Sequence, residues 1–277
     1  MALFTPTAYW ASATDLPLTP SDIPGLAGHY DASDTSSYYK SGTTIIGIYS
    51  QGSYGDILVV QGSSNPTAGT TQNGLATLYF DGSCNFYNTA NDNLVSSTGT
   101  HFAVGVFYPQ NVDDDKDSLW SVDSTYDYAI SADSPTQFLG EVDLGNGVGA
   151  AGTIGPQSGT NRENSWIIVS VMFTKIGYSS NYVLFAINST YGTNWNTLYN
   201  TNLSQSQKLR IMANRNANKK ASGRFAELLL VAGDRGVTGD VDRYVEQAEG
   251  YLAHKWGITS VLPSNHPYKT TAPTRSA

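Results

Sequence analysis

The sequence predicts an all-β protein, a sandwich or jelly roll of many short strands with one helix near its C-terminal end. The 277 residues suffice for one large domain with a substantial core. Aromatic residues make up 12% of the chain and charged residues only 14%, a composition that excludes intrinsic disorder. Runs rich in aromatic and β-branched residues recur between turn clusters without intervening helical patterns, which favours a sandwich over an alternating β-α fold.

Residues 1–22 are predicted to form an extended N-terminal arm, because they contain three prolines and show little periodicity. Phe4, Tyr9 and Trp10 are its expected anchors, since aromatic side chains supply a large contact area at small entropic cost. We expect the arm to dock on a neighbouring subunit. The alternative is a terminal strand that pairs with the sheet of its own domain.

Residues 23–262 are predicted to form the sandwich domain. In residues 102–108, larger apolar residues alternate with smaller ones, and Phe107 breaks this pattern. Residues 225–231 carry apolar side chains on both faces, as expected of a central strand that is covered on both sides. The predicted strands are 43–49, 56–61, 76–80, 101–108, 126–131, 166–176, 182–188, 207–213 and 225–231, and the glycine-rich residues 145–155 are among the predicted turns.

Residues 238–256 are predicted to form an α-helix that packs on the sandwich and ends before Gly257, with residues 263–277 as a tail rich in Pro, Ser and Thr. Because Leu252 belongs to the apolar face, we expect Leu252→Asp to impair folding far more than Glu249→Lys. The face repeats at helical spacing and consists of Val241, Tyr244, Val245, Ala248, Tyr251, Leu252 and Trp256.

The charge balance of the chain excludes several classes of partner. Lys and Arg number 15 and Asp and Glu number 23, a formal net charge of −8 that disfavours nucleic acid and anionic lipid. No run reaches the roughly 18 apolar residues of a membrane span. The first residues lack the pattern of a signal peptide, which predicts synthesis in a host cytoplasm without export. A single cysteine, Cys84, excludes an intrachain disulfide.

The predicted helix and its neighbours carry a family resemblance. They resemble the C-terminal signature of concanavalin A-like (laminin-G-like) jelly-roll domains, which are common in bacteriophage structural proteins and in some large bacterial surface proteins. The matching segments are Phe225-Ala-Glu-Leu-Leu-Leu-Val231, Glu249-Gly-Tyr-Leu-Ala-His-Lys-Trp-Gly257, Leu262-Pro263 and His266-Pro-Tyr268.

The N-terminal half of the domain resembles the same family. Ile23-Pro-Gly-Leu-Ala-Gly-His-Tyr-Asp-Ala-Ser33 is similar to its opening segment, although Gly28 and His29 stand where the family has an apolar residue and Trp. Phe80-Asp-Gly82 is similar to a strand of the family that closes on this turn. The resemblance implies a concanavalin A-like jelly-roll β-sandwich, a fold that hosts lectins, glycosidases and structural modules alike.

An exposed loop around Trp195 is the candidate glycan-binding segment. A Trp ring can stack on a sugar face while neighbouring amides bond its hydroxyl groups. The alternative is that Trp195 packs under its own loop or in a subunit contact. The candidate residues are Tyr191, Asn194, Trp195, Asn196 and Tyr199.

The acidic residues Asp113, Asp115 and Asp117 are a candidate Ca²⁺ site because several carboxylates lie close together in the sequence. They do not follow the EF-hand spacing, since Ser118 and Ser124 stand where that loop needs Gly and Glu. The alternative is a solvated turn. We otherwise expect no cofactor.

Glu141 and Asp143 stand two residues apart, a spacing that would point both to one face of a strand, and the segment resembles the strand that carries the catalytic carboxylates of jelly-roll β-glucanases. The position where those enzymes carry the second catalytic acid is occupied by Gly145 and Asn146. Polar alternation on an outward strand face explains the pair equally well, and we expect no enzymatic activity.

The family resemblance implies a structural protein of the bacteriophage virion surface, either a capsid decoration protein or a tail or fibre component. Its partners would be other virion proteins, further copies of itself and, in host attachment, a cell-surface glycan. The alternative function is a dedicated carbohydrate-binding, lectin-like module. A polysaccharide hydrolase is the third and least favoured function, because the second catalytic carboxylate is missing.

Overall fold

The computed structural model describes residues 16–53, 55–88, 101–112, 117–123, 127–134, 137–143, 149–154, 161–176, 180–191, 196–198, 208–214, 217, 219–231 and 241–275. Within these ranges the strands form two antiparallel sheets of nine strands each, accompanied by the α-helix α1 (Val241–Lys255). Three 3₁₀ turns complete the described elements: η2 (Pro20–Asp22), η3 (Thr35–Ser37) and η5 (Thr259–Val261). The predicted class, an all-β jelly-roll sandwich with one helix, is confirmed.

The first sheet has β18 at its centre, because β8 pairs with one edge of that strand while β6 and β1 share the other. At one end of the sheet, β15 and β16 both pair with β14. The order is β15 (Thr190–Tyr191), β14 (Ser180–Ile187), β13 (Ile167–Ile176), β8 (His101–Gln110), β18 (Ser222–Val231), β6 (Leu78–Asp81) and β5 (Thr67–Ala68), with β1 (Leu26–Asp31) and β16 (Asn196–Leu198) off this path.

The second sheet has β12 and β2 at its two edges. Its order is β12 (Gly149–Ile154), β11 (Gln137–Asp143), β10 (Asp127–Ser134), β9 (Asp117–Asp123), β17 (Lys208–Ile211), β7 (Cys84–Asn88), β4 (Ile57–Gly62), β3 (Thr44–Tyr49) and β2 (Tyr38–Ser41). The prediction of a turn over residues 145–155 is wrong for β12. Its glycines and alanines form an edge strand because pairing with β11 uses backbone groups, which do not depend on large side chains.

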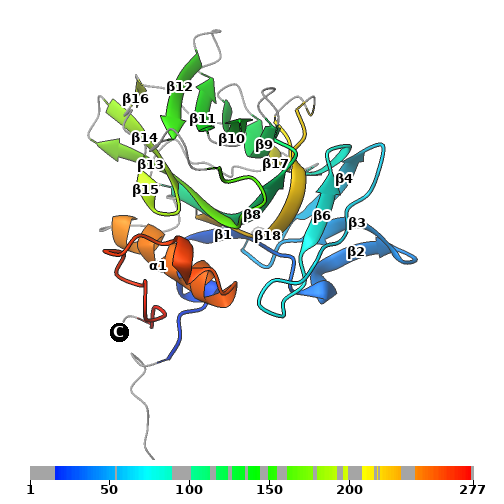
Figure 1. The fold of residues 1–277 in the computed structure, drawn as a ribbon, viewed down its shortest axis with the longest axis horizontal. Helices are drawn as coiled ribbons and strands as arrows, with labels where there is room; N and C mark the ends of the chain where they lie inside the picture. The colour runs from blue at the N-terminus through cyan, green and yellow to red at the C-terminus, as the bar shows by residue number, and fades with distance from the viewer. Residues whose placement is uncertain are drawn as a thin grey trace, which may run out of the picture.

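The layers stack in the order second sheet, first sheet, helix. Figure 1 shows α1 on the side of β8, β13 and β18 that faces away from β9–β12. One hydrophobic core fills the space between the two sheets, and a second core lies between the first sheet and α1. The first sheet is therefore covered on both faces, which explains why its central strands lack a clean polar alternation.

Strand β18 shows the two-sided burial that the sequence predicts. Leu228 and Leu230 belong to the core between the sheets, whereas Leu229 and Val231 belong to the core under the helix. Phe107 likewise fills the core between the sheets, where its ring centroid lies 5.7 Å from that of Phe225. The apparent break in the alternation of residues 102–108 is thus the second buried face of β8.

The helix packs on the sandwich as predicted, with Val245, Ala248 and Leu252 fully or almost fully buried. As expected, it ends before Gly257, whose φ of 65° lies in the left-handed region that glycine tolerates. The amide of Ile258 donates to the carbonyl of Ala253 at 2.8 Å, which closes the last turn. No helix of the described ranges is long and apolar enough to cross a membrane.

The described parts of the predicted arm and tail lie against each other. The Leu18 amide donates to the carbonyl of Pro273 at 2.9 Å, and Arg275 Nε lies 3.0 Å from Asp22 Oδ2. Leu18 is buried in the core under the helix. The expected arm anchors Phe4, Tyr9 and Trp10 lie outside the described residues.

Candidate functional site

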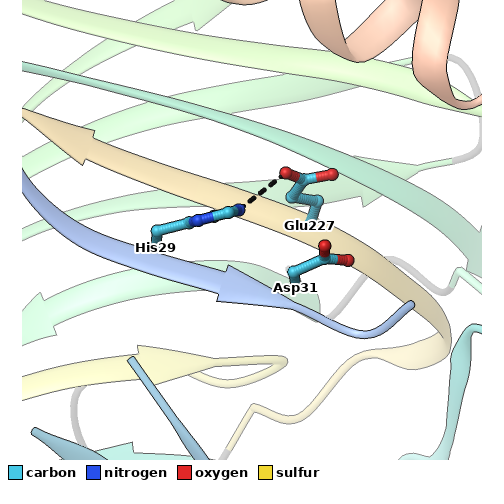
Figure 2. Close-up of side chains that lie close together, drawn as sticks. All are labelled: His29, Asp31 and Glu227. Carbon is cyan, nitrogen blue, oxygen red and sulfur yellow. Dashed lines mark hydrogen bonds and ion pairs between the residues drawn. The ribbon is translucent and has the colours of Figure 1, made fainter. Parts of the chain in front are cut away.

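A cluster of buried charged side chains lies between the first sheet and the C-terminal end of α1. His29 and Asp31 project from β1, and Glu227 projects from the neighbouring β18, where it pairs in register with Asp31. Figure 2 shows the three side chains converging, with His29 Nε2 at 2.8 Å from Glu227 Oε1. Glu227 is completely buried, and the other two are almost so.

The last turn of the helix completes this cluster. Lys255 Nζ lies 2.6 Å from Asp31 Oδ2 and 2.7 Å from Glu227 Oε2. Trp256 Nε1 donates to Glu227 Oε2 at 2.8 Å, and the Tyr251 hydroxyl donates to Oε1 at 3.2 Å. Each oxygen of Glu227 therefore accepts from two donors, and the carboxylate is fully satisfied without water.

The environment of Glu227 holds Tyr251 in its neutral form. Burial raises the pKa of Tyr251 well above its usual range, and the negative charges of Glu227 and Asp31 raise it further. The phenol consequently stays a hydrogen-bond donor to Glu227 over the whole physiological range of pH.

His29, Asp31 and Glu227 also meet a geometric criterion for a metal site, since one ligand atom of each lies within 4.8 Å of the others. The residues around them do not fit a metal. The ammonium group of Lys255 already occupies the position between the two carboxylates that a cation would take. We therefore assign this cluster a structural role, in which it ties the helix to β1 and β18.

A second buried carboxylate, Glu249, lies at the middle of the helix. Ser170 Oγ donates to Glu249 Oε1 at 2.5 Å, and Ser189 Oγ donates to Oε2 at 2.7 Å. His266 Nε2 lies 3.3 Å from the same Oε2. Glu249 is completely buried, so the structure overturns the expectation that Glu249→Lys is mild. The helical spacing predicts that Glu249 lies off the apolar face of the helix. In the structure its side chain is nevertheless buried, because it forms polar contacts with β13 and with the tail.

The family-like segments of the sequence converge on these two carboxylates. Glu227, Lys255 and Trp256 belong to the first cluster, and Glu249 and His266 belong to the second. Both carboxylates are completely buried; Glu227 accepts from four donors, and Glu249 has three hydrogen-bonding partners. These segments therefore attach the helix to the first sheet and to the tail.

The first cluster was not recognised in the sequence, although two signals point to it. Glu227 interrupts an apolar strand, and a charge at such a position requires a buried partner. His29 replaces an expected Trp at a position that the fold buries. Only the structure brings β1 and the end of the helix together around Glu227.

Two residues of the predicted glycan-binding segment, Tyr191 and Asn196, pair with the same strand. Tyr191 is the last residue of β15 and pairs with Ala186, whereas Asn196 is the first residue of β16 and pairs with Val183. Both partners belong to β14. Asn194, Trp195 and Tyr199 lie outside the described residues.

For those of the remaining candidate residues that the structure describes, only the position in the backbone is given. Asp117 begins β9, where it pairs with Ala132, while Asp113 and Asp115 lie outside the described residues. Glu141 and Asp143 lie two residues apart on β11, and therefore on one face of that strand, as predicted.

Comparison with known proteins adds a likeness in fold. No protein-family model matches the sequence, and neither does any curated protein. Among solved structures, domain 4 of AbnA, an extracellular arabinanase from Geobacillus stearothermophilus in complex with arabinotriose, is 13% identical. The match covers 76% of this chain and 94% of that one, with a TM-score of 0.43.

The binding domain of botulinum neurotoxin serotype C1 is 12% identical over 77% of this chain and 49% of that one, with a TM-score of 0.49. A heptameric pentraxin from Limulus polyphemus is 10% identical over 47% and 62%, with a TM-score of 0.34. Identities this low concern the fold alone. Sheet order, layers and helix together define the class of the protein: a jelly-roll β-sandwich with one helix packed on it.

Proposed function

We propose that the chain is a carbohydrate-binding, lectin-like domain that carries out no hydrolysis itself. The binding segment is the stretch from Tyr191 to Tyr199, with Trp195 as the stacking ring and Asn194 and Asn196 as hydrogen-bonding amides. Among the proteins of similar fold, domain 4 of AbnA forms a complex with arabinotriose, and cell entry of botulinum neurotoxin type C depends upon interaction with two ganglioside molecules. We therefore choose these two glycans as probes.

One observation about strand register supports this location. Tyr191 pairs with Ala186 and Asn196 pairs with Val183, so two residues of β14, 184 and 185, are passed by four residues of chain, 192–195. Asn194 and Trp195, the residue types that a sugar site requires, lie in the sequence between these two paired residues.

The proposal is tested by screening the protein on a glycan array that includes arabino-oligosaccharides and gangliosides. We expect Trp195→Ala to weaken binding at least tenfold and Trp195→Phe, which keeps an aromatic ring, to weaken it less. Asn265→Ala changes an exposed asparagine on the tail and serves as the matched control for Asn194→Ala. If the wild-type protein binds no glycan, or if Trp195→Ala binds as the wild type does, the proposal is wrong.

The absence of hydrolysis is tested separately. Incubation with β-glucans and arabinans is expected to release no reducing sugar, because the Glu141 and Asp143 pair lacks a partner acid. Any turnover that disappears in Glu141→Gln or Asp143→Asn would show that the domain is an enzyme.

The virion-surface role, as capsid decoration or as part of a tail or fibre, stays a prediction from the sequence resemblance. A glycan-binding domain is compatible with it, since host attachment uses cell-surface glycans. Electron microscopy of particles labelled with an antibody to this chain would test that role directly.

A further inference from the structure

Two tyrosines on the outer face of the second sheet are exposed to an unusual degree. Of the large hydrophobic side chains that the structure describes, three stand out as exposed: Leu16, Tyr39 and Tyr49, at 42%, 42% and 44%. Two of the three touch each other. The Tyr39 and Tyr49 rings meet edge to face, with their centroids 6.0 Å apart and their planes at 66°.

Strand register explains why the two rings meet. Tyr39 on β2 pairs with Gly47 on β3, and Tyr49 lies two residues further along β3, on the same face. Gly47 has no side chain to separate the rings. A Cβ added there would lie 2.6 Å from the carbonyl oxygen of Leu58, so the close approach of β3 to β4 requires glycine at this position. The aromatic pair therefore stands on a rigid backbone.

We propose that the Tyr39–Tyr49 pair is a second glycan-binding site, which stacks a neutral sugar ring. Along the same two strands and the turn that joins them, Ser41, Thr43 and Thr44 are exposed and offer hydroxyl groups that can bond sugar hydroxyls. The exposed Lys40 lies next to Tyr39 in β2, and its Nζ lies 5.3 Å from the centroid of the Tyr38 ring. A tyrosine combines a flat apolar face with a polar tip, which matches the alternation of CH and OH groups on a sugar.

The size of the patch favours a sugar over a protein partner. Fully covered aromatic side chains bury about 150–250 Å² each, so two rings exposed by 42% and 44% present on the order of 200 Å². A stable protein interface needs about 800 Å² from each partner. One or two sugar rings cover the patch, whereas a second copy of the chain would have to use the polar surface around it.

The proposed second site is separate from the first. Figure 1 shows β2 and β3 on the opposite side of the molecule from β14, β15 and β16. A short oligosaccharide cannot reach both sites, but a glycan-coated surface can engage two sites on one chain or across several chains. The expected benefit is avidity, which exceeds either single affinity by about 10²–10⁴-fold when geometry permits. The ligand class of this second site, a glycan, rests on the proposed function. Its location rests on the Tyr39–Tyr49 pair alone.

The experiment measures binding of tri- to hexasaccharides of neutral sugars in solution, chosen from the array, and binding to a surface coated with the same glycan. We expect two bound oligosaccharides per wild-type chain, and one in the double variant Tyr39→Ala/Tyr49→Ala. Binding of the double variant to the coated surface should fall at least tenfold. Tyr39→Phe/Tyr49→Phe keeps both rings and should retain most binding, and Leu16→Ala, which alters the third exposed side chain, should retain all of it.

Other results would overturn either this inference or the proposed function. The first is that the wild type binds a single oligosaccharide, that Trp195→Ala abolishes this binding and that the tyrosine variants retain it. This result would refute the second site but leave the proposed function intact. Loss of binding in the tyrosine variants alone would support the second site and refute the segment around Trp195. Sedimentation that shows a wild-type dimer and a monomeric Tyr39→Ala/Tyr49→Ala variant would identify the patch as a contact between copies. Absence of any glycan binding refutes both sites.

Discussion

Glu227 lies in the middle of a strand whose neighbouring side chains are apolar, and it accepts from four donors supplied by two segments of the chain, β1 and the C-terminal end of α1. Burying a carboxylate is costly, and this cost is offset only when every lone pair is satisfied. His29, Lys255, Trp256 and Tyr251 meet that condition together. The cluster therefore fixes the position of the helix on the sheet rather than adding much net stability.

We predict that Glu227→Gln lowers the free energy of unfolding by about 3 kcal/mol or more, because one oxygen becomes an NH₂ group that faces other donors. Asp242→Asn, a matching change at an exposed position in the first turn of the same helix, should cost less than about 1 kcal/mol. Urea denaturation of both variants measures the difference. Equal costs would contradict the network described for Glu227.

Glu249 gives the second prediction at this scale. Glu249→Lys should destabilise the protein by at least about 4 kcal/mol, because it buries an ammonium group and removes the acceptor of Ser170, Ser189 and His266. Leu252→Asp should be comparably severe. The exposed charge reversal Asp242→Lys is the control and should cost about 1 kcal/mol. A melting temperature of Glu249→Lys close to that of the control would refute the burial of this carboxylate.

Because the phenols of Tyr38 and Tyr251 are partly buried, we expect the free energy of unfolding to depend on pH in the alkaline range. Burial raises the pKa of both phenols above the unfolded value of about 10, with nearby carboxylates adding to the effect. Because the folded pKa is the higher one, the contribution to stability is complete below pH 10 and is lost as pH rises further. In an absorbance titration the two phenols should ionise only as the protein unfolds. Ionisation near pH 10 with the fold intact would contradict their burial.

At the scale of elements, the end of the helix is held by a loop from the far half of the sequence. Gln72 Nε2 donates to the carbonyl of Trp256 at 2.9 Å, and Asn73 Nδ2 donates to that of Lys255 at 2.8 Å. These two amides satisfy carbonyl groups that a helix leaves unpaired at its C-terminus. The loop before β6 and the end of α1 therefore stabilise each other.

Substitutions at Gly257 and Gly74 distinguish two contributions to this cap, the backbone conformation that favours glycine and the contact with Asn73. Both have positive φ, 65° and 76°, so alanine at either position strains the backbone by about 1 kcal/mol. A Cβ at Gly257 would lie 2.9 Å from Asn73 Cγ, whereas a Cβ at Gly74 meets nothing within 4 Å. We predict that Gly257→Ala is the more destabilising by about 1 kcal/mol, as measured by thermal unfolding. Identical losses would mean that Asn73 does not support the cap.

Elements with a strong side-chain pattern were predictable from the sequence, and the others were not. The runs 43–49 and 166–176 correspond closely to β3 and β13, and the helix was found because its apolar face repeats regularly. Strand β12 was missed because glycine and alanine carry no such pattern. The buried carboxylates were missed because their partners come from elements that only tertiary packing unites. Of the glycan-binding candidates, the structure adds the pairing of Tyr191 and Asn196 with one strand.

At the scale of the molecule, the two hydrophobic cores support different parts of the structure. The core under α1 anchors the helix together with the described part of the N-terminal arm, and the core between the sheets supports the outer surface of the second sheet. The proposed glycan sites lie at the two remote sides of this rigid sandwich, at β14–β16 and at β2–β3.

Nuclear magnetic resonance tests most directly whether this jelly-roll sandwich binds glycans at the two proposed sites. The labelled protein is titrated with the oligosaccharide that binds best on the array, and the backbone amides that shift are mapped on the structure. We predict two groups of shifting amides, one at residues 190–198 and one around Tyr39 and Tyr49. Saturable shifts confined to other regions, such as the contact between Asp22 and Arg275, or no shifts at all would contradict the claim.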